Sequence, residues 1–171
     1  DITPYNYIFQ RINWLTYDIL LKSSLAKSIT FNEQLRSGQE YNYFSKLVFK
    51  SVKAVFINEV LTLRRKHEKS IRANLKTNYE FIRGDFLTKI STYKEIKKLA
   101  SAKILYEYFF SCIKTAEKNN KIFRKNIFYI TYESIKLYGL IGVCIPIMFF
   151  MRLIIGTDYK IRMYFKKNMK L

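Results

Sequence analysis

Residues that break or constrain a backbone are scarce in this chain of 171 residues, which has 5 glycines and 2 prolines. A β-sandwich needs many tight turns, so this scarcity argues against that architecture and favours long helices. Histidine occurs once, as His67, and cysteine twice, as Cys112 and Cys144, without the spacing of a metal site. We therefore expect two buried thiols, no metal or cofactor, and no catalytic centre.

Acidic residues are also few. Lys and Arg total 31 against 13 Asp and Glu, which gives a net charge of +18. A chain this basic is expected to meet nucleic acid, anionic lipid or an acidic protein surface. The bias toward Lys, Ile, Asn, Tyr and Phe is typical of an A+T-rich genome, so the lysine count alone does not choose among these partners.

Five helices are predicted from apolar residues spaced three or four apart. The first, residues 4–26, begins at Thr3-Pro4, where Thr suits the N-cap and Pro the first turn. A capping box, Thr30 to Glu33, predicts a short helix that Ser37-Gly38 ends. The others are residues 40–82, ended by 83–85, residues 86–118, and a last helix that starts near 121 after a polar turn at 118–121.

The helix predicted over 40–82 carries the longest amphipathic stripe, from Phe44 to Ile82. Its middle is charged and contains the best candidate surface for a partner, a basic cluster of Arg64, Arg65, Lys66, Lys69 and Arg72. Such a cluster could neutralise RNA phosphates, with Tyr79 and Phe81 as stacking groups. We favour instead a solvated face or one that docks on an acidic neighbour, because the bases are dispersed along the chain.

The segment 137–155 predicts a transmembrane helix, because it has nineteen residues, one charge, and apolar residues on every face. The rival interpretations are a buried core helix, which the charge of Arg152 supports, and an interfacial helix. Pro146 would break the interior of a soluble helix, whereas membrane helices tolerate proline. A basic tail follows the segment. The residues expected to contact anionic phospholipid or an acidic partner are Arg152, Lys160, Arg162, Lys166 and Lys167.

The sequence thus predicts an all-α protein with long amphipathic helices and one C-terminal transmembrane helix. We divide it into a basic helical arm, 1–120, and a segment that changes from amphipathic to transmembrane, 121–171. The start at Asp1 would be explained by a cleaved presequence.

The predicted function is a non-catalytic accessory subunit of a large membrane complex, single-pass in the mitochondrial inner membrane, in a respiratory-chain or ATP-synthase assembly. Its partners would be other subunits and a cardiolipin-like phospholipid. The alternatives are an organellar ribosomal or other RNA-binding protein, and a membrane-anchored tethering or translocation component.

Overall fold

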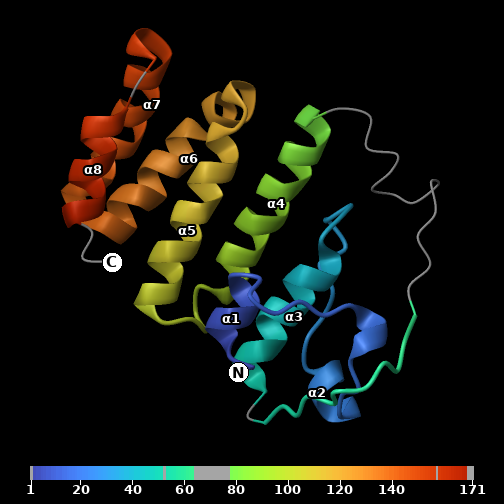
Figure 1. Ribbon diagram of the computed structural model, residues 1–171. Coiled ribbons are helices and arrows are strands. Elements are labelled where there is room, and N and C mark those ends of the chain that lie inside the picture. Colours follow the sequence, from blue (N-terminus) through green and yellow to red (C-terminus); the bar gives the residue numbers. More distant parts are fainter. Residues whose placement is uncertain (1, 52, 64–77, 157, 169–171) are drawn as a thin grey trace. The chain divides into compact units, whose positions relative to one another are not determined.

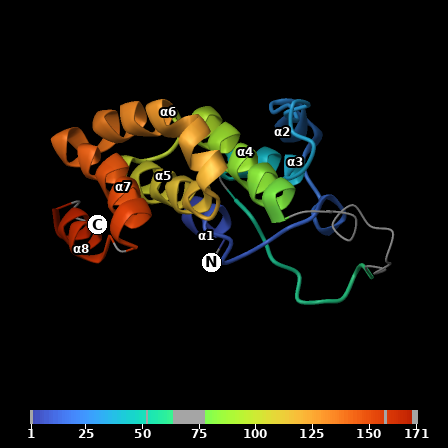
Figure 2. The same cartoon turned by 90° about the horizontal axis from the view of Figure 1, so that it is seen from above.

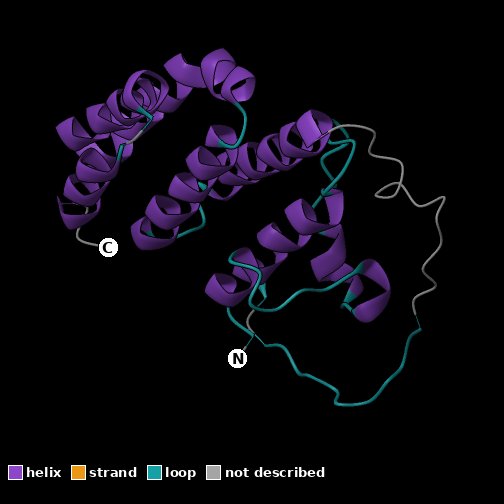
Figure 3. Cartoon of the chain, turned by 45° about the horizontal axis from the view of Figure 1, so that its top comes forward, coloured by secondary structure: helices purple, strands orange, loops and turns teal. Residues whose placement is uncertain are grey.

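The computed structural model describes residues 2–51, 53–63, 78–156 and 158–168, without the side chains of residues 78, 152, 165 and 166. Every regular element in these ranges is a helix, and Figure 3 shows no strand among them, so the all-α prediction is confirmed. The elements are α1 Pro4–Ile8, η1 Thr16–Asp18, α2 Ser23–Lys27, α3 Gln39–Lys50, α4 Asn78–Ile96, α5 Ala102–Glu117, α6 Asn120–Tyr138, η2 Gly139–Val143, α7 Cys144–Ile155 and α8 Tyr159–Asn168 (Figure 1).

The chain forms two compact units, Asp1–Tyr108 and Phe109–Leu171, and α5 contributes to both. In the first unit α3 packs on α1 and α4. Its core is largely aromatic and aliphatic, built around Tyr7, Phe44, Leu47 and Val48. A short ion pair of 2.6 Å between Lys46 Nζ and Glu95 Oε2 also joins α3 to α4. The predicted division at residue 120 stays a prediction.

The helix predicted over 4–26 is wrong beyond its first turns. Its start is confirmed, since Thr3 Oγ1 accepts a hydrogen bond from the Asn6 backbone N–H at 3.1 Å. The helix ends at Ile8, and Gln10 adopts a positive φ of 55°. The chain then turns so that Trp14 packs against Tyr7, with ring centroids 4.7 Å apart. Aromatic packing therefore outweighs the helical spacing of this stretch.

The short helix predicted from the capping box at Thr30 is also wrong, because residues 30–37 form turns. Asn32 explains the difference: its Oδ1 accepts from the Gln34 backbone N–H at 3.1 Å, and its Nδ2 donates to Glu95 at 2.6 Å. A side chain that bonds nearby backbone in this way competes with helix formation. Gly38 then begins α3 with a φ of 73°, close to Thr88 of α4.

The single helix predicted over 40–82 is wrong too. α3 ends at Lys50, residues 53–63 are extended, and α4 begins at Asn78 and passes through the predicted break at 83–85. Phe44 and Val48 are buried against neighbouring helices, whereas Phe56, Val60 and Leu63 are exposed. A helix gains most of its stability from packing its apolar face, so the periodic stretch 44–82 is helical only where other parts of the chain cover that face.

The helix predicted over 86–118 is divided by a turn at 97–101, where the backbone N–H groups of Leu99 and Ala100 both donate to the Ile96 carbonyl. The polar turn at 118–121 is confirmed. Asn119 caps α6, since its Oδ1 accepts from the backbone N–H of Lys121 at 3.0 Å and of Ile122 at 3.4 Å.

Two phenylalanines of the periodic stretch 44–82 give a direct test of this fold. Phe44 is 2% exposed and Phe56 is 74% exposed. Phe44→Ala should lower the free energy of unfolding by about 3–5 kcal/mol through lost burial and a cavity. Phe56→Ala, the matched control, should change it by less than about 0.5 kcal/mol. Denaturant unfolding of both variants measures this, and equal losses would show that residues 53–63 are packed.

Candidate membrane-binding surface

The apolar segment 137–155 is interrupted by a bend near its start. Gly139 adopts φ 65° and ψ −150°, a backbone conformation that is essentially restricted to glycine. The 3-10 helix η2 follows, and α7 begins only at Cys144. The uninterrupted helix predicted from 121 to 155 is therefore wrong. Pro146 lies in the first turn of α7, where its missing N–H costs no helical hydrogen bond.

The bend folds η2 and α7 back onto α6. A Cβ added to Gly142 would overlap the Ser134 carbonyl oxygen of α6, so the two backbones are in direct contact. Farther along, the rings of Phe123 and Phe149 stack with centroids 4.0 Å apart. In an unbroken helix these two residues would be about 39 Å apart at ~1.5 Å per residue. Helices α6 and α7 therefore form an antiparallel hairpin (Figures 1 and 2).

One side of η2 and α7 is apolar and exposed, and we call it the apolar stripe. Its members are spaced three or four residues apart, as on one face of a helix: Leu140, Val143, Ile147, Phe150 and Ile154. They range from 39% exposed at Val143 to 87% at Leu140. The opposite side of α7 is covered, since Ile145 and Met148 are fully buried. The helix is thus apolar at every position except Arg152, and it is packed on one side only.

Several basic side chains are exposed on the helices that flank the apolar stripe. On α6 they are Lys121, Arg124, Lys125 and Lys136, and on α8 they are Lys160 and Lys167. Two of the residues predicted to contact lipid or an acidic partner, Lys160 and Lys167, therefore face solvent. The side chains of Arg152 and Lys166 lie outside the described part of the chain.

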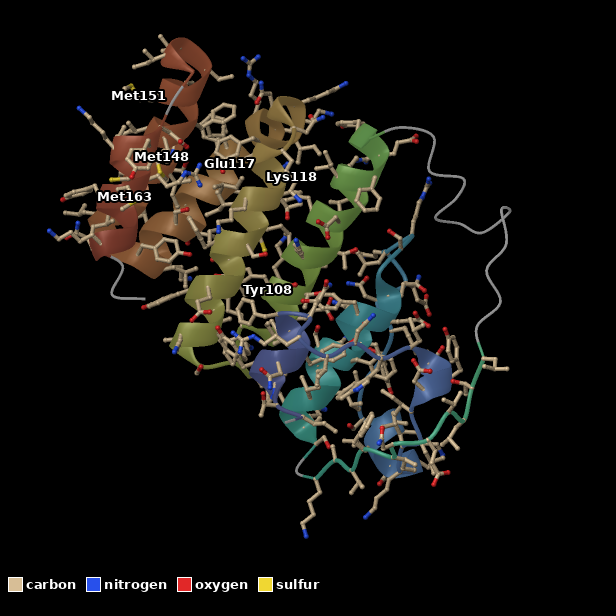
Figure 4. All side chains as sticks on the ribbon, in the orientation of Figure 1. Tyr108, Glu117, Lys118, Met148, Met151 and Met163 are labelled. Atoms are coloured by element: carbon tan, nitrogen blue, oxygen red, sulfur yellow. The ribbon has the colours of Figure 1, made fainter. Side chains whose placement is uncertain are left out.

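Arg162, the remaining member of that predicted set, interacts with carboxylates of its own chain. Its Nη2 lies 3.1 Å from Glu117 Oε2, at the end of α5 (Glu117 is labelled in Figure 4), and it also pairs with Asp158. The Glu117 side chain is only 7% exposed. The hydrogen bond to Asp158 raises the pKa of Arg162 above its ordinary value, and Glu117 adds to this rise. The guanidinium therefore stays charged and holds α8 to the end of α5.

The basic cluster predicted between Arg64 and Arg72 lies outside the described residues, as does His67. Cys112 is buried, and Cys144 is half-buried. Among the residues that the structure describes, no three His, Cys, Asp or Glu side chains come together as metal ligands would.

The run Asn120–Ile155 is long and apolar enough to cross a membrane, judged by length and composition alone. Comparison of the chain with family models, curated proteins and solved structures found no match in any of the three. A functional proposal therefore rests on the apolar stripe and on the exposed basic side chains of α6 and α8.

Gly142 tests the contact between η2 and α6. Gly142→Ala places a methyl group against the Ser134 carbonyl, and overpacking of this kind should cost about 1–3 kcal/mol. Leu140→Ala on the same short helix is the control, because Leu140 is 87% exposed. Thermal unfolding in mild detergent compares them. A Gly142→Ala protein as stable as the parent would show that η2 does not lie against α6.

Proposed function

We propose that this protein is a non-catalytic, membrane-attached structural subunit of a larger assembly. The observation that carries the proposal is the apolar stripe on η2 and α7, whose members are 39% to 87% exposed in the described part of the chain. Burying a fully exposed side chain of this size gains about 1.5–3 kcal/mol, and each member of the stripe gains in proportion to the surface it still exposes. A continuous apolar surface of this kind is a typical site for membrane or protein contact.

The charge distribution favours an anionic membrane. Exposed bases lie on both α6 and α8, on either side of the stripe in sequence. Each Lys or Arg near an anionic surface contributes about 1 kcal/mol of attraction. The net charge of +18 adds a long-range attraction of the same sign.

A second exposed apolar segment supports the assembly part of the proposal. Residues 53–63 are extended, and their large apolar side chains point to solvent: Val55, Phe56, Ile57, Val60, Leu61 and Leu63. An isolated soluble protein seldom keeps such a segment uncovered. A neighbouring subunit would bury these side chains, as a partner of an accessory protein does.

In its finer form the proposal is an accessory subunit of a respiratory-chain or ATP-synthase complex in the mitochondrial inner membrane, where cardiolipin-like lipid would meet the basic residues. Attachment through residues 137–155 can take one of two forms. In the first, the run Asn120–Ile155, which is long enough by residue count, crosses the membrane once. Alternatively, the hairpin of α6 and α7 stays folded and enters one leaflet.

Fractionation tests the proposal. Native membranes are washed with alkaline carbonate and then extracted with mild detergent. We expect the protein to remain through carbonate and to migrate after detergent in a complex far larger than 20.6 kDa. Release by carbonate together with co-sedimentation with RNA would support the RNA-binding alternative instead. In that case the co-sedimentation should weaken steeply as the salt concentration rises, because the contacts are electrostatic.

A charge placed in the apolar stripe gives a matched test of the purified protein. Phe150→Asp with Ile154→Asp should reduce binding to phosphatidylcholine–cardiolipin vesicles by at least about tenfold, since a buried charge is costly and apolar contact is lost. The control is Phe81→Asp with Leu87→Asp on α4, residues 53% and 45% exposed in the first unit, which changes the net charge equally. Equal binding by both variants in vesicle flotation would exclude the stripe as the attachment site.

A further inference from the structure

We propose that residues 137–155 enter a single leaflet of an anionic bilayer and return, so that α8 lies on the same side of the membrane as the start of α6. This inference rests on the proposed membrane attachment and specifies its topology. It differs from the single crossing that the sequence predicts. Its basis is a set of contacts that the chain before the apolar segment makes with that segment and with the chain after it.

The first of these contacts is the ion pair between Glu117 and Arg162. Glu117 precedes the apolar segment, at the end of α5, and Arg162 follows it, on α8, yet their charged atoms are 3.1 Å apart. A bilayer has a hydrocarbon core of about 30 Å. If the segment crossed that core, the two residues would lie on opposite sides, and the nearly buried Glu117 carboxylate would lose its partner.

The second contact is the stack of Phe123 on Phe149, with centroids 4.0 Å apart. It closes the hairpin of α6 and α7, and the contact of Gly142 with Ser134 closes it nearer the bend. A crossing by the whole run would require α6 and α7 to straighten and both contacts to be lost. The folded hairpin keeps them.

The length of α7 agrees with entry into one leaflet. It has 12 residues, and at ~1.5 Å per residue it is about 18 Å long. That is too short to cross the ~30 Å hydrocarbon core, and because the basic helix α8 packs along α7, the apolar stripe and not the end of α7 would enter the lipid. After α7, Gly156 adopts a φ of 73°, and α8 runs back along α7 (Figure 1). The chain therefore reverses direction on both sides of α7.

The faces of α7 suit this placement as well. Ile147, Phe150 and Ile154 belong to the exposed apolar stripe. Ile145 and Met148, on the other face, are fully buried. Among the described side chains of α7, those that would meet lipid are therefore apolar.

Helix α8 has the composition of a helix that lies in the membrane interface. Tyr159 and Tyr164 are 68% and 57% exposed, and Lys160 and Lys167 are exposed beside them. Tyrosine favours the headgroup level because it is amphipathic, and lysine pairs there with anionic headgroups. With the first turns of α6, which expose Lys121, Arg124 and Lys125, it would place positive charge on one side of the bilayer.

A pair of cysteines tests the topology in the full chain. Lys121→Cys and Lys167→Cys are introduced together with Cys112→Ala and Cys144→Ala, and circular dichroism checks the helix content. The protein is bound to sealed phosphatidylcholine–cardiolipin vesicles and treated with a membrane-impermeant maleimide. Mass spectrometry then counts the labels on each molecule, so that mixed orientations do not blur the result.

We expect molecules with two labels, or with none when they face the lumen, and no molecules with one. A population with one label before detergent and two after it would overturn the inference while leaving membrane attachment intact. Failure of the parent chain to bind vesicles would overturn the proposed attachment and the inference together.

A second measurement replaces Lys121→Cys and Lys167→Cys with a different pair of cysteines. Glu117→Cys and Arg162→Cys, made in the same cysteine-free chain, are bridged by a short bis-maleimide that keeps the two sites near each other. Bridged and unbridged proteins should float equally well with the vesicles, because the folded hairpin is the bound form. Loss of flotation on bridging would show that the hairpin must open to enter the membrane.

Discussion

The close approach of η2 to α6 is the constraint on which the second unit depends. Gly142 lies against the Ser134 carbonyl, where no side chain fits, and Gly139 supplies the backbone conformation that brings it there. Because the chain turns at that point, Phe149 reaches Phe123, Ile145 and Met148 are buried, and a single side of α7 remains exposed. The ion pair of Arg162 with Glu117 then holds α8 to the same unit.

The helical class and several element ends could be read from the sequence, because local chemistry determines them. Thr3 with Pro4 begins α1, and Asn119 caps α6, each through a hydrogen bond to backbone within three residues. Helix lengths could not be read in the same way. Phe44 and Phe56 occupy equivalent positions in one periodic stripe, but only Phe44 has neighbours that bury it. Periodicity identifies an apolar face and not the surface that covers it.

Two glycines show that residue type alone does not predict where a helix ends. Gly84 was expected to end a helix and lies inside α4, whereas Gly139 was expected inside a helix and ends α6. The residue type permits either backbone conformation, and long-range packing decides between them. The apolar segment itself was evident from composition, as was its basic flank. Its reversal was not, because two of the contacts that hold it join residues 26 and 45 positions apart.

The exposed segment 53–63 has a consequence for the behaviour of the isolated protein. It presents a row of β-branched, leucine and phenylalanine side chains to water, with its backbone outside any helix or sheet. Exposed segments of this composition pair readily with copies of themselves. Residues 53–63 therefore give the protein a route to aggregation wherever no other molecule covers them.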